Sequence, residues 1–270
     1  MVQTPRRPSP DALSAFGAME PPYALEGGQG ETWQAGAIVL KPAGDPAETA
    51  WRAEVLDGLD DTTDFRVARP VRASDGSWIV DGWQSWHVVE GKEDHHRPDD
   101  VLRVAEAFHA AIAGLPRPSF LDVRDDPWTH ADRMAWDETG LAGSDPAMDL
   151  LSRLAGWRRP VDLPAQPVHG DLLGNVLFAD RLPPAVIDWP VYYRPASWAA
   201  AVVVIDALCW YAASADLLDR WSGLPEWSQM LVRALIYRLA TDDALSGSHG
   251  PSPDTLEAYQ RVIDLIEARL

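Results

Sequence analysis

One stretch of the chain, residues 168–190 (VHGDLLGNVLFADRLPPAVIDWP), restricts its possible folds more than any other. Two short apolar runs within it, residues 176–178 and 185–187, predict two neighbouring strands. The segment between them, residues 179–184, is rich in residues that favour turns. We therefore expect a β-hairpin, and a hairpin of this length brings its two ends close together.

Three polar residues flank this predicted hairpin. Asp171 and Asn175 precede the first strand, and Asp188 directly follows the second. Because the two ends of a hairpin meet, we expect the three side chains to converge on one point. Carboxylate and amide oxygens are the ligands that a hard cation such as Mg²⁺ prefers. One carboxylate would remain to orient a hydroxyl group.

Two other interpretations fit the same residues. The first is a structural hairpin whose polar residues only cap its strands. The second is a metal hydrolase in which His169 and Asp171 form an H-x-D ligand pair. The stretch offers no further His or Cys ligand of the kind that most such sites need, so we favour the site for a hard cation.

The hairpin and its flanking residues resemble the catalytic segment of the aminoglycoside phosphotransferase family, the small-molecule branch of the protein-kinase-like fold. The residues that match this segment are His169, Gly170, Asp171, Asn175 and Asp188. The resemblance places Asp171 and His169 in the catalytic loop, where Asp171 would orient the substrate hydroxyl and His169 would brace the loop. It makes Asn175 and Asp188 the metal ligands.

The chain departs from the kinase pattern at two places. Protein kinases carry Asn five residues after the catalytic Asp, whereas Asn175 follows Asp171 by four. Only two leucines and a glycine lie between them, so the loop carries no Lys or His. Pro190 stands where kinases have the Gly of D-F-G. These departures keep open an alternative, a catalytically silent nucleotide-binding regulatory module of the same fold.

A second set of motifs lies near the N-terminus. Two short strands are expected around a glycine turn, and the second strand is AGAIVLK, residues 35–41. Glycines leave the backbone bare enough to approach a phosphate. The glycines of this turn are Gly27, Gly28 and Gly30. Lys41 resembles the Lys of the kinase V-A-I-K strand, so the resemblance implies that the turn and Lys41 bind nucleotide phosphates.

The next segment, residues 45–59, predicts a helix with an apolar face. Asp45 is suited to cap its N-terminus. A kinase-like fold needs a Glu on this helix to hold Lys41. We expect Glu54 to fill that role, with Glu48 as the alternative.

Two further strands are predicted at residues 65–73 and 78–89. Residues 83–91 fall where the phosphotransferase family joins its two lobes, and in that fold the joining backbone pairs with the edge of adenine. By position alone, the resemblance implies three neighbours of adenine, which are Gln84, Trp86 and Val88.

Most of the remaining chain predicts helices, since apolar residues recur at helical spacing. The expected helices cover residues 98–115, 149–157, 198–213, 231–241 and 253–270. With the resemblance, this implies an α+β, protein-kinase-like two-lobed fold, with a small antiparallel-sheet N-lobe and a mainly helical C-lobe. Gly91 sets the boundary, so the N-lobe would be residues 1–90 and the C-lobe residues 91–270.

The charge of the chain restricts its partners. Its 41 acidic and 23 basic residues give a formal net charge of −18, which disfavours binding to nucleic acid and to anionic membranes. The most apolar segment carries Asp206 and reads as a buried helix. We see no signal peptide, and the single cysteine excludes an intrachain disulfide. We therefore expect a cytoplasmic protein, whose oligomeric state the sequence does not predict.

The resemblance implies an enzyme, a small-molecule kinase that uses ATP and Mg²⁺ to phosphorylate a hydroxyl group of a small polar molecule. Phosphoryl transfer depends mostly on positioning and on neutralisation of charge. The acidic balance of the chain favours a cationic substrate. Choline-like, homoserine-like and sugar kinases share this pattern, and the sequence does not choose among them.

Overall fold

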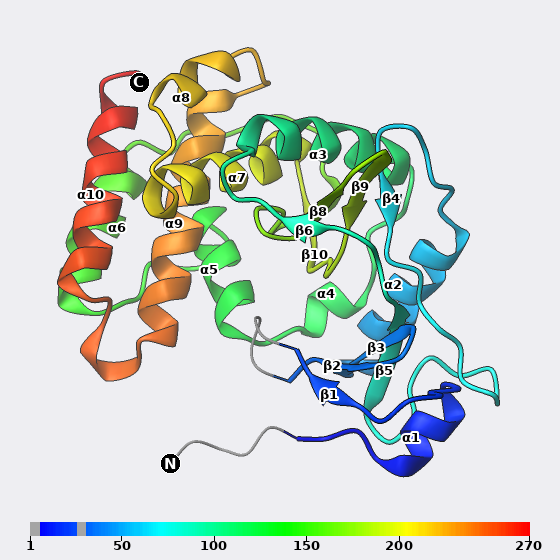
Figure 1. Cartoon of the computed structure of the whole chain (residues 1–270). Coiled ribbons are helices and arrows are strands. Elements are labelled where there is room, and N and C mark those ends of the chain that lie inside the picture. Colours follow the sequence, from blue (N-terminus) through cyan, green and yellow to red (C-terminus); the bar gives the residue numbers. More distant parts are fainter. Residues whose placement is uncertain (1–5, 26–30) are drawn as a thin grey trace. The chain divides into compact units, whose positions relative to one another are not determined.

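The computed structural model describes residues 6–25 and 31–270, and these residues form two compact units (Figure 1). The N-terminal unit contains the chain up to Lys92 together with Leu177–Asp188. The C-terminal unit contains Glu93–Val176 and Trp189–Leu270. The predicted α+β class is confirmed, because the chain combines short, mostly antiparallel strands with many helices.

The N-terminal unit is built on a four-stranded sheet with the order β1-β2-β3-β5. Its strands are β1 (Tyr23–Ala24), β2 (Trp33–Ala35), β3 (Ile38–Pro42) and β5 (Trp83–His87). Neighbouring strands run antiparallel, as the sequence predicts. The predicted glycine turn joins β1 to β2, but its residues Gly27, Gly28 and Gly30 lie outside the described residues.

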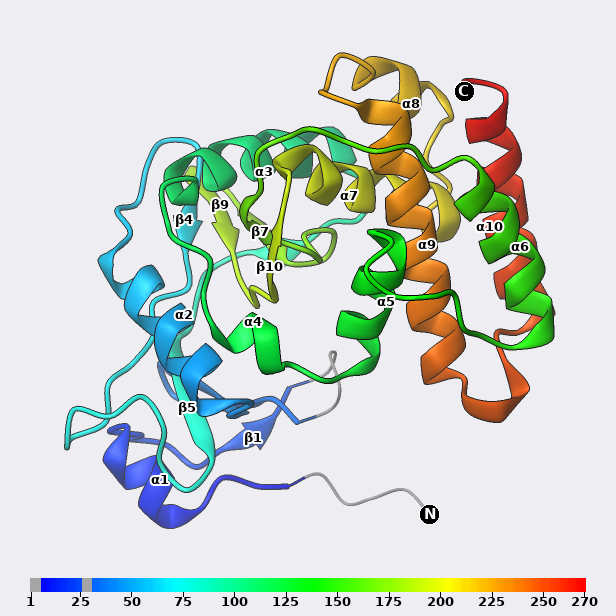
Figure 2. The same ribbon diagram turned by 180° about the vertical axis from the view of Figure 1, so that it is seen from behind.

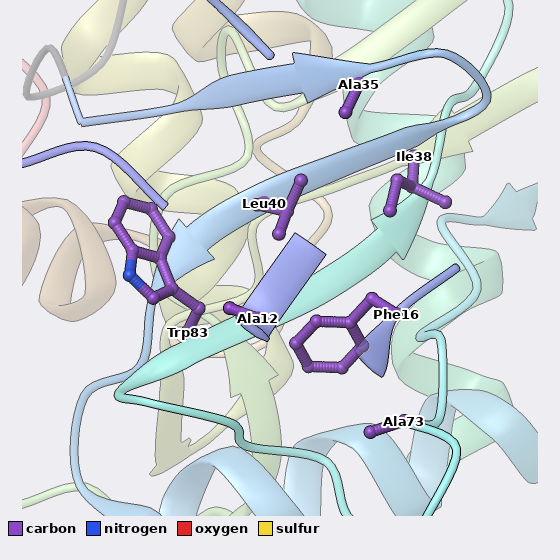
Figure 3. Close-up of a cluster of buried hydrophobic side chains, with 7 residues drawn as sticks. All are labelled: Ala12, Phe16, Ala35, Ile38, Leu40, Ala73 and Trp83. Atoms are coloured by element: carbon purple, nitrogen blue, oxygen red, sulfur yellow. The ribbon is translucent and has the colours of Figure 1, made fainter. Parts of the chain in front are cut away.

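One face of this sheet packs on the short helix α1 (Pro10–Ala15) to form an apolar core (Figure 3). Ile38 and Leu40 of β3 both point into this core, because alternate residues of a strand share one face. The buried core residues are Ala12, Phe16, Ala35, Ile38, Leu40, Ala73 and Trp83. Lys41 therefore projects from the opposite face of the sheet.

Helix α2 (Pro46–Gly58) contacts the sheet face that carries Lys41 through its residue Arg52. Asp45 caps the helix as predicted, and its Oδ1 accepts two backbone hydrogen bonds from the first turn, both at 2.9 Å. Arg52 of α2 donates a hydrogen bond to the side chain of Gln84 at 3.1 Å. Gln84 lies directly across from Lys41 in the β3–β5 register, so the contact holds the helix on this face.

A second sheet has the order β4-β9-β8-β6 and contains the predicted hairpin. Its strands are β4 (Arg66–Val67), β6 (Lys92–Glu93), β8 (Val176–Ala179) and β9 (Leu182–Val186). The hairpin turn is shorter than the predicted residues 179–184, since only Asp180 and Arg181 separate β8 from β9. Arg181 has a φ of 65°, the left-handed conformation found in tight hairpin turns.

The predicted strands at residues 65–73 and 78–89 are also shorter in the structure, where they are reduced to β4 and β5. Pro70 has no backbone N–H and cannot extend the ladder of β4. Asp81 and Gly82 both have positive φ values, so the chain turns just before β5 begins.

The C-terminal unit is mainly helical, as predicted. Its helices are α3 (Pro98–Ile112), α4 (Phe120–Val123), α5 (Pro127–Ala135), α6 (Asp145–Gly156), α7 (Ala196–Trp210), α8 (Asp216–Arg220), α9 (Trp227–Leu245), the 3₁₀ turn Gly247–His249 and α10 (Pro253–Glu267). Helix α9 contacts α5, α6, α7 and α10 (Figures 1 and 2). It therefore forms the centre of this unit.

Helix α7 is the segment that the sequence marks as most apolar, and it is almost completely buried. It carries Asp206 within its buried length. In the part of the chain that the structure describes, no helix is long and apolar enough to cross a membrane.

Candidate active site

The predicted catalytic loop follows strand β7 (Gln166–His169), which pairs antiparallel with β10 (Val191–Arg194). His169 is fully buried at the end of β7. Its backbone N–H donates to Nε2 of His109 at 3.0 Å, and its ring Nδ1 accepts from the backbone N–H of Asp171 at 3.1 Å. These contacts suit His169 to brace the loop, the role that the sequence assigns to it.

His109, on α3, supports this brace as a neutral acceptor. Burial lowers the pKa of His109 to about 3, and the charge of His169 acts in the same direction. An imidazole that stays neutral can accept the backbone hydrogen bond at Nε2. His109 is itself buried.

Gly170 is required by close packing. A Cβ atom placed at this position would lie 2.4 Å from the ring of Tyr192, and Tyr192 is itself buried on β10. Gly170→Ala should therefore destabilise the fold by about 1–3 kcal/mol, the usual cost of overpacking. Urea unfolding of the variant measures this cost. Gly156→Ala is the matched control, because a Cβ there meets no atom within 4 Å; an equal loss in both variants would contradict the packing argument.

Asp171 is held by contacts from both sides of its carboxylate. Asn175 Nδ2 donates to the backbone oxygen of Asp171 at 2.6 Å and lies 3.3 Å from its Oδ2. Arg238 of α9 donates from Nη2 to Oδ1 of Asp171 at 2.6 Å. The same guanidinium bonds both carboxylate oxygens of Asp206, with Nε at 2.8 Å from Oδ1.

The shortened loop closes as a tight turn. Asn175 N–H donates to the carbonyl oxygen of Leu172 at 2.9 Å. Gly174 has a φ of 91°, and a Cβ there would lie 2.9 Å from Nε2 of His95. His95 in turn stacks on Tyr211, with ring centroids 4.1 Å apart. A glycine is therefore needed at position 174 both for the backbone conformation and for space.

A cavity of about 210 Å³ opens beside Asp171 within the C-terminal unit. Its lining residues are Asp171, Leu173, Asp206, Trp210, Tyr211, Arg238, Asp242 and Tyr259. Asp242 accepts a hydrogen bond from the Tyr259 hydroxyl at 2.6 Å. Burial raises the pKa of Asp242. Three carboxylates against one guanidinium leave this cavity with a negative formal charge. Sequence reasoning missed its C-terminal members, which lie on α9 and α10.

The electrostatics of the cavity centre on the buried pair of Asp206 and Arg238. Burial raises the pKa of Asp206 to about 6, against the opposing attraction of Arg238. Burial alone would lower the pKa of Arg238, but the charges of Asp206 and Asp171 raise it well above its usual value. Arg238 therefore stays a cation throughout the usable pH range.

In the N-terminal unit, Lys41 Nζ forms an ion pair with Oδ2 of Asp188 at 2.7 Å. Asp188 has a φ of 53°, a left-handed conformation that Asp and Asn tolerate better than most residues. Burial lowers the pKa of Arg52, against the opposing charges of Glu48 and Asp188. The structure thus brings together the predicted phosphate-binding Lys41 and the predicted metal ligand Asp188.

The expected pair of Lys41 and Glu54 is corrected by the structure. Glu54 Oε1 lies 3.3 Å from Nε1 of Trp78 and 3.6 Å from Nη2 of Arg72. Arg52 faces the sheet, and Glu54 lies two residues later, about 200° around the helix. Its side chain therefore points away from the face that carries Lys41.

Lys41 and Glu54 should consequently differ in their effect on nucleotide. Lys41→Ala should raise the Kd for MgATP about tenfold or more, because a charged contact worth about 1.5–3 kcal/mol is lost. Glu54→Gln should leave this Kd unchanged, and it serves as the charge-removal control on the same unit. Calorimetric titration of both variants gives the two constants. Equal Kd values for MgATP in both variants would show that Lys41 does not bind the nucleotide phosphates.

The expected adenine neighbours are part of the sheet. The backbone of β5 pairs with β3 on one side, and on the other it bonds residues 69–71 through Ser85 and His87. Gln84 is buried, and the Arg52 guanidinium lies over the Trp86 ring. Backbone pairing with adenine at Gln84 and Trp86 is therefore blocked. Val88 N–H also donates within the unit, to Ala37.

The predicted metal ligands have the right donor atoms. Asp188 offers a carboxylate, and Asn175, whose amide nitrogen is used on Asp171, offers its amide oxygen. Oxygen ligands fit Mg²⁺. Within residues 6–25 and 31–270, no cluster of three or more His, Cys, Asp or Glu side chains could hold a metal ion. The Mg²⁺ site formed by these two residues stays a prediction.

Comparison with known sequences finds one informative relative. The chain is 32% identical over 191 residues to a probable ketoamine kinase of Thermus thermophilus. This match covers 62% of the chain and 66% of the relative, so the chain spans slightly less than two thirds of that protein. No protein-family model matches the chain.

Comparison with solved structures finds the same architecture along nearly the whole chain. An aminoglycoside phosphotransferase of Alicyclobacillus acidocaldarius superposes with a TM-score of 0.59 at 17% identity, over 99% of this chain and 95% of the other. A choline kinase of Streptococcus pneumoniae gives 0.55 at 14% identity, over 94% and 96%. An aminoglycoside phosphotransferase solved with ADP and hygromycin B gives 0.60 at 14% identity, over 95% and 96%.

Proposed function

Because this chain has the protein-kinase-like fold of the aminoglycoside phosphotransferases and choline kinases, we propose that it transfers the γ-phosphoryl group of ATP to a hydroxyl group of a small molecule. The observation that carries this proposal is the setting of Asp171. Its carboxylate is fixed at one oxygen by Arg238 and lines a cavity large enough for a small substrate. Structures of this fold solved with ADP support ATP as the donor.

Each site residue would have a distinct role in this reaction. Lys41 would hold nucleotide phosphates, and Asp188 and Asn175 would hold Mg²⁺, which neutralises charge on the transferred phosphoryl group. Asp171 would orient the acceptor hydroxyl and take its proton. His169 would keep the loop in place through its bond to the Asp171 backbone.

The ion pair of Lys41 and Asp188 gives this proposal a physical consequence. A bound nucleotide would replace Asp188 as the partner of Lys41, and a bound cation would replace Lys41 as the partner of Asp188. Each of the two charges thus keeps an opposite charge when MgATP binds. We infer that the pair holds both side chains ready for the nucleotide while no nucleotide is bound.

The acceptor is proposed to be small, hydroxylated and cationic. The cavity beside Asp171 has a volume of about 210 Å³ and carries three carboxylates and one guanidinium, so an ammonium group would be favoured there. The relative from Thermus thermophilus carries the name of a ketoamine kinase. An adduct of a sugar and an amine has both the hydroxyl groups and the cationic nitrogen, so a ketoamine is the first acceptor to test.

The test is a panel of acceptors incubated with MgATP, with ADP formation and phosphorylated product both measured. The panel contains fructosyl-lysine as the ketoamine, choline, homoserine, hygromycin B, and glucose as an uncharged sugar. We expect product from a cationic member and little from glucose. Glucose as the best acceptor would contradict the cationic substrate, and no product from any member would count against the kinase proposal.

One observation favours a second candidate, a silent nucleotide-binding module. Asn175 follows Asp171 by only four residues, one fewer than in protein kinases. The shorter loop would place the amide oxygen of Asn175 differently for Mg²⁺. Tight MgATP binding without phosphoryl transfer to any acceptor would favour this module over the kinase.

A further inference from the structure

Arg238 connects the predicted catalytic loop to the centre of the C-terminal unit. Its guanidinium bonds both oxygens of Asp206 on α7 and, through Nη2, Oδ1 of Asp171 at 2.6 Å. The Arg238 side chain is 12% exposed and that of Asp206 9%, whereas that of Asp171 is 46% exposed. Arg238 and Asp206 thus form a buried ion pair, and the Asp171 carboxylate that Arg238 holds is exposed to solvent.

The loop itself holds this carboxylate only through one long contact. Between Asp171 and Asn175 the chain has only apolar residues and a glycine. Asn175 bonds the Asp171 backbone at 2.6 Å but reaches its carboxylate only at 3.3 Å, at Oδ2. Without Arg238 the Asp171 carboxylate would keep only the 3.3 Å contact from Asn175. A cation from α9, the guanidinium of Arg238, therefore restrains the Asp171 side chain.

We propose that Arg238 is a positioning residue, which Asp206 anchors and which holds Oδ1 of Asp171 so that Oδ2 receives the proton of the acceptor hydroxyl. This inference rests on the proposed kinase function. In the step, the acceptor oxygen forms a bond to the γ-phosphorus while its proton passes to Oδ2 of Asp171. The bond from that phosphorus to the bridging oxygen breaks, and ADP leaves with both electrons of that bond.

A purely structural role for Arg238 would use Asp206 alone. The bond to Asp206 already satisfies a buried cation, and breaking a buried ion pair costs several kcal/mol. The additional bond from Nη2 to Asp171 goes to a half-exposed carboxylate, where a surface ion pair adds little stability. The contact from Arg238 to Asp171 therefore indicates that Arg238 positions the carboxylate in addition to stabilising the fold.

The test compares Arg238→Met and Arg238→Lys with Arg233→Met. Arg233 is the matched control, because it is a buried guanidinium on the same helix whose bonds go to Gln229 and to the Arg159 carbonyl. The acceptor is the panel compound that the unmodified chain phosphorylates fastest. The readouts are kcat, KM for the acceptor and the Kd for MgATP. A double variant, Arg238→Met with Asp206→Asn, removes one buried charge of each sign and guards against misfolding.

We expect kcat to fall about a hundredfold in Arg238→Met and in the double variant, the cost of a misplaced catalytic group. The Kd for MgATP should not change, Arg238→Lys should recover part of kcat, and Arg233→Met should keep it. A folded Arg238→Met or double variant with the kcat of the unmodified chain would overturn the positioning role, as would an equal fall in Arg233→Met. If the unmodified chain phosphorylates no acceptor, the proposed function fails first and this inference fails with it.

Discussion

Asp171→Asn is expected to lower the rate of phosphoryl transfer by roughly two to four orders of magnitude, the usual scale for general acid–base catalysis. An amide has the shape of the carboxylate but cannot take the proton of the acceptor hydroxyl. Asp206 continues to hold Arg238 through two hydrogen bonds, so the buried ion pair below the site should be retained. Nucleotide binding should be unchanged, since Lys41 and Asp188 are not altered.

The measurement is a single-turnover rate together with a titration of MgATP. Asp180→Asn is a suitable control, because Asp180 is an exposed carboxylate in the hairpin turn and its loss changes the net charge by the same amount. Loss of MgATP binding in Asp171→Asn would show that this residue serves the nucleotide and not the acceptor. An unchanged rate would place the active site elsewhere.

Asp188→Asn is expected to act on the metal. The left-handed φ of 53° at this position suits Asn as well as Asp, so the fold should be retained. A hard cation loses an anionic oxygen, and a charged contact of about 1.5–3 kcal/mol corresponds to about a tenfold or larger change in Kd. The variant also frees Lys41 from its ion pair, so ATP without metal should bind at least as well as before.

The decisive quantity is therefore the ratio of the two ATP dissociation constants, with Mg²⁺ and with EDTA. We expect this ratio to approach one in Asp188→Asn and to stay unchanged in Asp171→Asn. If Asp171→Asn loses the Mg²⁺ effect and Asp188→Asn keeps it, the two roles are reversed.

The hairpin could be predicted from the sequence because its geometry is local. Two apolar runs joined by turn residues pair as β8 and β9 with no help from distant parts of the chain. The α+β class followed from helical spacing in the later chain and from the strand around Lys41, and the comparisons confirm the predicted protein-kinase-like fold. The exact strand lengths did not follow, since Pro70 and the turn at Asp81 end pairing that the apolar pattern would continue.

The partners of Asp171 could not be predicted. Arg238 lies 67 positions away in the sequence, and only the packing of α9 against α7 brings it to Asp206 and to the loop. Nothing in the local pattern of α9 distinguishes Arg238 from Arg233. The Arg233 guanidinium is also buried, but it bonds the side chain of Gln229. The acidic cavity is likewise assembled from segments far apart in the chain.

The assignment of Glu54 failed for a different reason, and here the sequence did hold a signal. Glu48 and Arg52 are four residues apart and share one face of α2, whereas Glu54 lies on the other. The Arg52 contact to Gln84 shows which face meets the sheet. Reading the helix by its charged pair would have placed Glu54 on the face away from the sheet.

We propose that Asp171 serves phosphoryl transfer from ATP to a small hydroxylated molecule. The most direct measurement uses ATP labelled at the γ-phosphate, in a single turnover with the acceptor panel, and follows the label by mass spectrometry. We expect the label to move to the hydroxyl of a cationic acceptor in the unmodified chain and to stay on ATP in Asp171→Asn. ATP that remains bound and intact with every acceptor, or label that moves equally well in Asp171→Asn, would contradict it.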